Sequence, residues 1–385
     1  MSKVLPLSGK AATAEPAPFH SVSEILAELR DGRMVIVMDD EDRENEGDLI
    51  MAAERVTPAA VAFMIRYTSG IICVPMEEAA LARLELPQMV PLNSESQRTA
   101  FTVSVDVRAG TSTGVSSADR AATIRALADP SASAADFARP GHIFPLRSRR
   151  GGVLVRAGHT EAAVDLCRLA GLSPVGVLCE VMNDDGSMAR RAQLQEFARR
   201  HQLKIGTIAD LIRHRLRNER TVVRISEQAV QTELGEFRLY AYQDELSQEV
   251  HVALARGQLD AAEPPLVRVH IADTLRDLLG VKAAPRAWSL RAAMQRIVES
   301  GSGVVVVLRQ PESARELADA VRSFVAATPL DAPAADRAVL RTFGVGAQIL
   351  TDLGVRRMRV LSAPKQMHGL SAFGLEVESY VGEEG

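Results

Sequence analysis

A short apolar run followed at once by a dense acidic segment is the feature that most constrains this fold. Residues 34–38 read Met-Val-Ile-Val-Met, which is typical of a buried strand. Seven of the ten residues from 39 to 48 are carboxylates, and a single Arg lies among them. Carboxylates that close repel one another unless a cation lies among them. The sequence therefore predicts a strand that delivers oxygen ligands to a site for positive charge.

The acidic segment has three competing interpretations. Most such runs are solvated surface, but surface runs seldom follow a buried-looking strand directly. A calcium-binding EF-hand loop fits in part, since Asp42, Glu44 and Glu46 occupy its positions 1, 3 and 5. It fails at position 12, where Ala53 replaces the bidentate Glu, and the preceding run is strand-like where a helix is required. An enzyme site for Mg²⁺, which needs only one or two protein ligands, is the interpretation that remains.

Length and composition predict a two-domain cytoplasmic protein. At 385 residues the chain exceeds one typical core, and a densely charged stretch at 213–220 marks the expected boundary. The net charge of −4 argues against nucleic acid as a partner. No apolar run approaches the ~20 residues that cross a membrane. Three cysteines without paired spacing are typical of reduced thiols.

Alternating short strands and helices predict an α/β (α+β) fold for both halves. Four apolar runs in the first half read as strands: 71–74, 101–107, 152–155 and 175–182. A capped helix is expected after Thr57, and further helices are expected before Asp129 and after Thr160. We expect a disordered tail at 1–19, a first domain at 20–215 and a second domain at 216–385.

A second group of polar residues lies in the same predicted first domain. His142 follows Pro140 and Gly141, and Glu180 interrupts an otherwise apolar strand. A carboxylate in such a strand needs a cation or a proton, which makes Glu180 a candidate acid or base. In the segment 156–161, a Gly allows close approach of a ligand, and an Arg beside helix amides predicts a phosphate site.

Each of these residues also has an ordinary structural explanation. A lone His is more often hydrogen-bonded than catalytic. Glu180 fits an edge strand that faces water, and Cys73 in its apolar run reads as a small buried side chain. Taken together, a phosphate site, two histidines and extra carboxylates in one domain favour catalysis.

These motifs, in this order, resemble 3,4-dihydroxy-2-butanone-4-phosphate synthase over residues 20–215. The resemblance rests on five runs: 40–48, 113–116, 141–146, 156–161 and 179–188. It implies an enzyme that makes a four-carbon riboflavin precursor from ribulose 5-phosphate and releases formate. It also implies Mg²⁺ (or Mn²⁺) as cofactor and a homodimer as the assembly.

Carried over to this chain, the resemblance implies a role for each motif. Glu44 and His159 match the metal ligands, and His142 and Glu180 match residues needed for the chemistry. The implied substrate contacts are Arg43, Glu44, Asp48, Cys73, Thr113, Arg156, Ala157, Gly158, His159, Thr160 and Glu180. A base removes the C3 proton, and further proton transfers accompany loss of water, a skeletal shift and expulsion of C4 as formate.

Residues 221 to about 380 resemble GTP cyclohydrolase II but lack its zinc ligands. The run 268–270 and the segment 346–350 match that family, whereas its three Cys positions hold Asp273, Ala284 and Arg286. A carboxylate, a methyl group and a cation do not form a tetrahedral zinc site. The expected phosphate-binding run is replaced at 311–314, and Phe343 stands at a Tyr position. We predict no zinc and no GTP hydrolysis, which leaves a structural or regulatory role.

Two alternatives stay open for the whole chain. The first is a bifunctional enzyme that retains GTP cyclohydrolase II activity through a metal site rebuilt from Asp273, His270 and His251, residue types that ligate metals. The second is a non-enzymatic protein that senses a nucleotide or flavin. That second alternative expects losses in the first domain, where every motif position is present.

Overall fold

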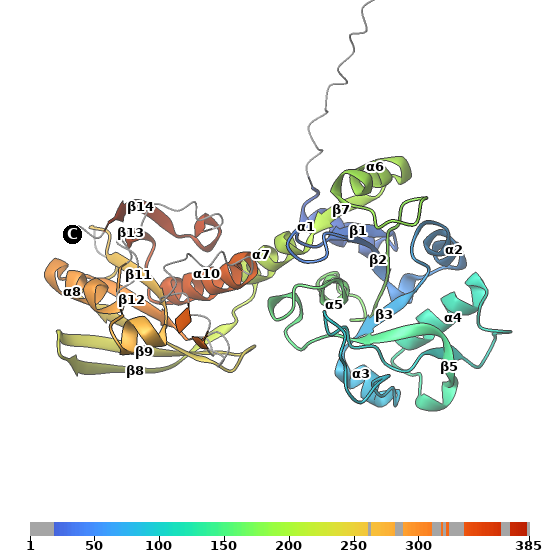
Figure 1. The fold of residues 1–385 in the computed structure, drawn as a ribbon, viewed down its shortest axis with the longest axis horizontal. Coiled ribbons are helices and arrows are strands. Elements are labelled where there is room, and N and C mark those ends of the chain that lie inside the picture. Colours follow the sequence, from blue (N-terminus) through green and yellow to red (C-terminus); the bar gives the residue numbers. More distant parts are fainter. Residues whose placement is uncertain are drawn as a thin grey trace, which may run out of the picture. The chain divides into compact units, whose positions relative to one another are not determined.

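Two compact units make up the chain. The computed structural model describes residues 19–260, 263–281, 288–309, 317–318, 321–322, 335–362 and 370–382, so the expected tail lies outside it except for Phe19. One unit comprises residues 19–148 and 158–208, and the other comprises 149–157 and the chain from 209 onward. Each unit contains a seven-stranded sheet (Figure 1). The predicted two-domain α/β fold is confirmed. Among the residues described, no helix is both long and apolar enough to span a bilayer.

The sheet of the first unit is mixed, with strand order β4-β5-β3-β6-β2-β1-β7. Its strands are β1 (Val35–Met38), β2 (Gly47–Ala52), β3 (Cys73–Met76), β4 (Val105–Val107), β5 (Phe137–Arg147), β6 (Gly176–Glu180) and β7 (Lys204–Thr207). Strand β2 runs antiparallel to both β1 and β6, and β3 runs parallel to β5. Every residue of β1, β2 and β3 is buried, so both faces of the central sheet are covered.

Helices with well-defined starts surround this sheet. They are α1 (Val22–Arg30), α2 (Pro58–Tyr67), α3 (Glu78–Arg83), α4 (Ser117–Ala128), α5 (His159–Leu169) and α6 (Arg191–His201), with 3₁₀ turns η1 (Ala53–Arg55) and η2 (Ala134–Asp136). A capping box of Ser21 and Glu24 starts α1, and Thr57 caps α2 before a Pro at its first turn. The helices expected after Thr57, before Asp129 and after Thr160 are therefore confirmed.

One strand expected from the sequence is wrong. The apolar run 152–155 forms the 3₁₀ turn η3 (Gly152–Leu154). Gly151 and Gly152 have φ values of 93° and 60°, which turn the chain where a strand would extend it. The strand β2, which begins inside the acidic segment at Gly47, was not predicted, because the charges of that segment masked its apolar continuation.

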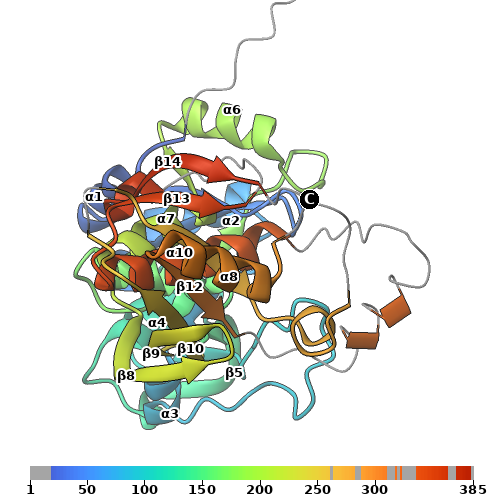
Figure 2. The same ribbon diagram turned by 90° about the vertical axis from the view of Figure 1, so that its left-hand side faces the viewer.

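The second unit is also a sheet with helices on both faces. Its strands follow the order β14-β13-β11-β12-β10-β9-β8. They are β8 (Val222–Thr232), β9 (Gly235–Asp244), β10 (Val250–Arg256), β11 (Leu266–Ile271), β12 (Gly303–Leu308), β13 (Arg357–Leu361) and β14 (Glu376–Val381). The helices are α7 (Ile208–Asn218), α8 (Leu290–Ser300) and α10 (Ala335–Asp352), with short turns η4 (Thr274–Leu278) and η5 (Leu370–Phe373). Strands β13 and β14 are the adjacent red arrows in Figure 2.

Alternation along β12 builds two separate cores. Val304, Val306 and Leu308 belong to a cluster with α10, whereas Val305 and Val307 pack with α8. Because successive side chains of a strand point to opposite faces, one apolar strand serves both layers. The apolar pattern of the GTP cyclohydrolase II-like half is thus sufficient for a packed core.

Candidate active site and metal centre

A tight connection between β1 and β2 carries the acidic segment. The two strands pair in register from Val35 opposite Ile50 to Met38 opposite Gly47, so the chain leaves β1, makes a short loop and returns at once. Gly47 leaves room at the return for Leu194, since a Cβ there would lie 2.7 Å from a methyl carbon of that residue, which would have to shift. The sheet therefore fixes both ends of the acidic loop, residues 39–46.

Asp39 organises the interior of the acidic loop. Its Oδ1 accepts a hydrogen bond from the Glu46 amide at 2.9 Å, and its Oδ2 accepts one from the Glu44 amide at 3.1 Å. The guanidinium of Arg43 also donates to Oδ2 of Asp39 at 2.9 Å and to Glu44 at 2.5 Å. Asp39 thus acts as an internal brace, and the single Arg of the segment pairs with two of its acids.

Three side chains converge where the acidic loop meets α5. One ligand atom each from Asp39, Glu44 and His159 lie within 4.8 Å of one another, the only such group of three or more His, Cys, Asp or Glu residues in the described chain. His159 Nδ1 lies 3.8 Å from Glu44 Oε2 and 3.7 Å from Asp48 Oδ1. The structure thus brings together Glu44 and His159, which the sequence assigned as metal ligands.

The tautomer of His159 follows from its second hydrogen bond. Its Nε2 lies 3.1 Å from the carbonyl oxygen of Val37, which only accepts. Nε2 therefore carries a hydrogen, and in the neutral form of the ring the Nδ1 lone pair faces Glu44 and Asp48. An imidazole oriented by a main-chain carbonyl and facing carboxylates is a common form of metal ligand.

Burial and like charge raise the proton affinity of the two acids behind this group. Burial, followed by repulsion from Glu180 and Glu44, raises the pKa of Asp48 well above its usual range. Burial also raises the pKa of Glu46. Asp48 Oδ1 is buried and has no hydrogen-bond partner among the described residues. An orphaned acceptor among converging carboxylates fits a bound cation, because a cation supplies the missing charge.

Glu180 enters the same region from β6. It ends that strand directly opposite Asp48 in the antiparallel pairing of β2 and β6. Ser69 Oγ donates to Glu180 Oε2 at 2.7 Å. Cys73 lies in β3, paired with Leu178 of β6, and burial raises the pKa of its thiol well above the usual range. Its thiol is therefore un-ionised at neutral pH, as expected for a small buried side chain.

His142 belongs to a different set of contacts. It lies in β5, and its Nδ1 and backbone amide bond the two carboxylate oxygens of Asp106 at 2.7 and 2.9 Å. A Cβ at Gly141 would lie 2.0 Å from the carbonyl carbon of Val105, so only Gly lets β5 approach β4 this closely. The Pro-Gly-His motif therefore has a structural reason for its Gly.

The remaining predicted substrate contacts lie in two segments. Thr113 is exposed in the loop 110–116, which is shaped by Asp119 accepting from the amides of Ser112 and Gly114. Gly158 is the N-cap residue of α5, and the buried Thr160 lies in its first turn. Arg156 and Ala157 belong to the second unit.

The residues considered for a metal site in the second unit, His251, His270 and Asp273, make ordinary hydrogen bonds. His270 Nε2 pairs with both carboxylate oxygens of Asp277, at 2.9 and 2.8 Å. Asp273, at the first expected zinc position, accepts from the amides of Leu275 and Arg276 and so caps η4. His251 Nδ1 accepts from the Arg309 amide at 3.2 Å. The positions 284, 286 and 311–314, with the side chain of Phe343, lie outside the described residues.

Four site residues were missed by sequence reasoning: Asp39 as a brace, Ser69, Asp106 and Arg190. Arg190 donates to the carbonyls of Glu44 and Asn45 from the start of α6. Asp106 carried a usable signal, because it interrupts an apolar strand as Glu180 does. Arg190 carried none, since it is 146 residues from Glu44 in the chain.

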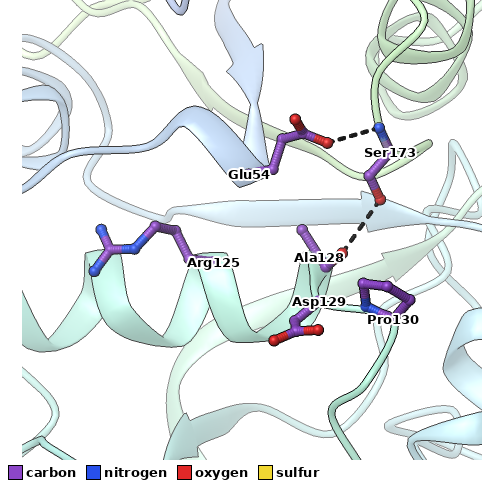
Figure 3. Close-up of a pocket in the computed structure, with 6 residues that line it drawn as sticks. All are labelled: Glu54, Arg125, Ala128, Asp129, Pro130 and Ser173. Carbon is purple, nitrogen blue, oxygen red and sulfur yellow. Dashed lines mark hydrogen bonds between the residues drawn. The ribbon is translucent and has the colours of Figure 1, made fainter.

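A cavity of about 460 Å³ lies elsewhere in the first unit (Figure 3). It is lined by Glu54, Arg125, Ala128, Asp129, Pro130 and Ser173. Glu54 accepts from the Ser173 amide at 2.8 Å, and Ser173 Oγ lies 3.3 Å from the Ala128 carbonyl. None of the predicted catalytic or metal-binding residues lines this cavity, so it is separate from the acidic site.

The mixed sheet, the acidic loop and the oriented histidine together define an α/β protein with a cluster of two carboxylates and one imidazole that could hold a cation. Residues 23–214 match the family model of 3,4-dihydroxy-2-butanone 4-phosphate synthase, and residues 223–382 match that of GTP cyclohydrolase II. The chain belongs to the 3,4-dihydroxy-2-butanone 4-phosphate synthase family and acts in riboflavin biosynthesis.

Relatives extend over both units. A 3,4-dihydroxy-2-butanone 4-phosphate synthase of Pseudomonas aeruginosa is 53% identical over 365 residues, which cover 95% of this chain and 99% of that protein. Riboflavin biosynthesis protein RibBA of Salinispora arenicola is 48% identical and covers 94% of this chain and 88% of its own length. The crystal structure of RibBX, a two-domain 3,4-dihydroxy-2-butanone 4-phosphate synthase from A. baumannii, matches with a TM-score of 0.81 at 42% identity. The match covers 94% of this chain and 99% of that chain.

Proposed function

We propose that the acidic loop and α5 hold Mg²⁺ (or Mn²⁺). With this ion bound, the enzyme converts ribulose 5-phosphate to 3,4-dihydroxy-2-butanone 4-phosphate and formate. The observation that carries this proposal is the approach of His159 Nδ1 to Glu44 Oε2 at 3.8 Å, with Asp39 in the same group. Hard carboxylate oxygens and one imidazole suit Mg²⁺ or Mn²⁺ better than a thiol-seeking metal. When bound, such an ion polarises substrate oxygens as a Lewis acid.

Side chains of this chain would bind, orient and move protons. Glu44 and His159 would hold the ion, and Arg43 would orient Glu44. The α5 amides after Gly158 favour an anionic group such as the phosphate of the substrate. Glu180, which accepts a hydrogen bond from Ser69 at 2.7 Å in a region crowded with carboxylates, would accept a proton from the substrate.

Replacement of the two proposed proton-transfer residues tests this function. We expect Glu180→Gln or His142→Ala to abolish formate release from ribulose 5-phosphate while thermal unfolding and the circular dichroism spectrum stay those of the wild type. Full formate release by either purified variant would refute its assignment. No release by the wild type with Mg²⁺ or Mn²⁺ would refute the function itself and favour the sensing alternative.

The second unit is proposed to have no GTP cyclohydrolase activity and no zinc. Support comes from Asp273, which caps a helical turn, and from His270, which is paired with Asp277. The described residues give no group that joins Asp273, His270 and His251 as ligands. The test is metal analysis with GTP turnover on one preparation, where stoichiometric zinc and formate from GTP would overturn this proposal.

The domain limits, the assembly and the location of the enzyme follow the same reasoning. We place the synthase domain at 20–215 and the GTP cyclohydrolase II-like domain at 216–385. The family resemblance supports a homodimer, and three buried free cysteines are consistent with a reducing cytoplasm. Sedimentation at several concentrations tests the dimer.

A further inference from the structure

We propose that Asp106 is the positioning residue for His142, which it holds in the tautomer whose Nε2 can accept a proton from the substrate. This inference rests on the proposed function, because it gives His142 its role in that reaction. Asp106 comes from β4 and His142 from β5, 36 residues apart in the chain. Nothing in the motif around His142 contains this carboxylate.

The geometry fixes both the position and the protonation of the ring. Asp106 Oδ1 accepts from the backbone amide of His142 at 2.9 Å, and Oδ2 lies 2.7 Å from Nδ1. An ionised carboxylate only accepts, so the hydrogen of a neutral ring is on Nδ1. The lone pair is therefore on Nε2, the outer nitrogen of a side chain that is 44% exposed.

This arrangement suits proton transfer at Nε2. When Nε2 takes a proton, a new N–H bond forms and the electron pair of the broken bond stays on the substrate. The positive charge that develops on the ring is stabilised by the carboxylate at Nδ1, as in other His–carboxylate pairs. The proton leaves again from Nε2 in a later step, so Asp106 itself does not change protonation.

The surrounding loop reserves space for this pair. A Cβ at Gly114 would lie 2.1 Å from Asp106 Oδ2 and 2.9 Å from His142 Nδ1. The nearby carboxylate of Asp119 already accepts from Ser112 and from the Gly114 amide, so it fixes the loop. The loop that carries Thr113 therefore packs against the Asp106–His142 bond, and Gly114 leaves the space that this bond occupies.

Asp106→Asn is the decisive variant. Its carbonyl oxygen still accepts from the His142 amide, while its NH₂ group donates to Nδ1 and moves the ring hydrogen to Nε2. We expect kcat to fall by about 10²-fold or more with KM within about threefold. Nitrogen-15 histidine spectra, with His142 assigned through a His142→Gln variant, should show the hydrogen on Nδ1 in the wild type and on Nε2 in Asp106→Asn.

Matched variants separate this role from a structural one. Asp136→Asn neutralises a carboxylate just before β5 that bonds only Ser133 among the described contacts, and it should stay within about twofold of the wild type. Gly114→Ala and Gly110→Ala both place a side chain at positive φ, 83° and 74°, but Gly110 has open space. We expect Gly114→Ala to lose about tenfold more kcat than Gly110→Ala.

The outcomes divide cleanly. An Asp106→Asn enzyme with kcat within threefold of the wild type, or a wild-type ring with its hydrogen on Nε2, would overturn the proposal. Equal losses in the two glycine variants would overturn the role of the loop. The tautomer is read without turnover, so failure of the proposed function, seen as no formate from the wild type, is a separate result.

Discussion

Two buried histidines, His159 in the first unit and His270 in the second, meet carboxylates in opposite ways. His159 gives its N–H to a main-chain carbonyl and turns Nδ1 toward Glu44 and Asp48. His270 instead pairs its Nε2 directly with Asp277. The arrangement at His159 brings the acceptor oxygens of Glu44 and Asp48 near one ring nitrogen. The arrangement at His270 provides a hydrogen-bond partner for the Asp277 carboxylate.

The difference shows what distinguishes the proposed metal site from a structural pair. Asp48 Oδ1 has no hydrogen-bond partner among the described residues, and burial raises its pKa. Asp277 accepts from His270 and from the Asp273 amide, and Asp273 accepts from two amides of η4. A bound cation would compensate the first set of charges, whereas hydrogen bonds meet the charges of the second set, where the buried His270 Nδ1 also has no partner among the described residues. Equal burial of two histidines therefore carries little information until their partners are known.

Replacing the two histidines by the same residue sharpens this comparison most. We expect His159→Asn to lower kcat for formate release by at least ~10³-fold, because it removes a proposed metal ligand. His270→Asn should leave formate release within about twofold. The check is a formate assay on both variants with Mg²⁺ in excess. Similar losses in the two variants would mean that the second unit takes part in the reaction.

The pair in the second unit should matter for stability. His270→Asn removes the donor to Asp277, a largely buried carboxylate, and should lower the free energy of unfolding of that unit by about 1–3 kcal/mol. Denaturant unfolding followed through Trp288, the one Trp of the chain, measures this change. Glu299→Gln on the surface of α8 is the control. An unchanged midpoint would show that the pair does not hold the unit together.

Arg190 provides a test of the acidic loop itself. Since it donates to the carbonyls of Glu44 and Asn45, we expect Arg190→Ala to raise the Mg²⁺ concentration for half-maximal activity by about tenfold. Saturating metal should restore most of kcat. Arg199→Ala, which removes an exposed partner of Glu196 on the same helix α6, serves as control. An unchanged metal requirement would contradict a positioning role for Arg190.

The raised pKa of Asp48 gives the smallest expected effect, and its sign is definite. The folded protein holds the Asp48 proton more tightly than the unfolded chain. In metal-free buffer the free energy of unfolding should therefore fall as pH rises from the ordinary carboxyl range through the raised pKa.

The Asp48→Asn variant should not show the Asp48 contribution to this fall in the free energy of unfolding. It should therefore be more stable than the wild type at neutral pH, by on the order of 1 kcal/mol. Thermal melts with a chelator between pH 5 and 8 measure the difference. Asp129→Asn is the control that should keep the fall, because hydrogen bonds from Ser131 lower the pKa of Asp129 and it stays ionised throughout this pH range. If the free energy of unfolding of the wild type rises with pH across this range, as that of Asp48→Asn does, the raised pKa assigned to Asp48 is contradicted.

Sequence reasoning was most successful where chemistry is local. The family, the two α/β units and the synthase activity were predicted from motifs and are confirmed. Glu44 and His159 were chosen from segments 115 residues apart and lie together (159 − 44 = 115). Their proposed roles as ligands stay predictions, as do those of His142 and Glu180.

What the sequence could not supply depends on strand pairing and on backbone geometry. Asp106 serves His142 only because β4 pairs with β5, and Ser69 reaches Glu180 across 111 residues. The wrong strand at 152–155 failed because two glycines adopted positive φ, a conformation that the apolar pattern does not encode. Hydrophobic periodicity predicts elements, whereas partners come from how the sheet orders them.

The brace formed by Asp39 has a consequence for how this site can change. Its two oxygens tie down amides of the same short connection, so most of the shape of that connection is encoded within eleven consecutive residues, 38–48. The conformation of such a segment depends mainly on its own residues. We expect that residues 38–48 can be grafted into another protein that has an antiparallel strand pair and a guanidinium at the place of Arg190. The segment should keep its conformation even where the flanking apolar residues differ.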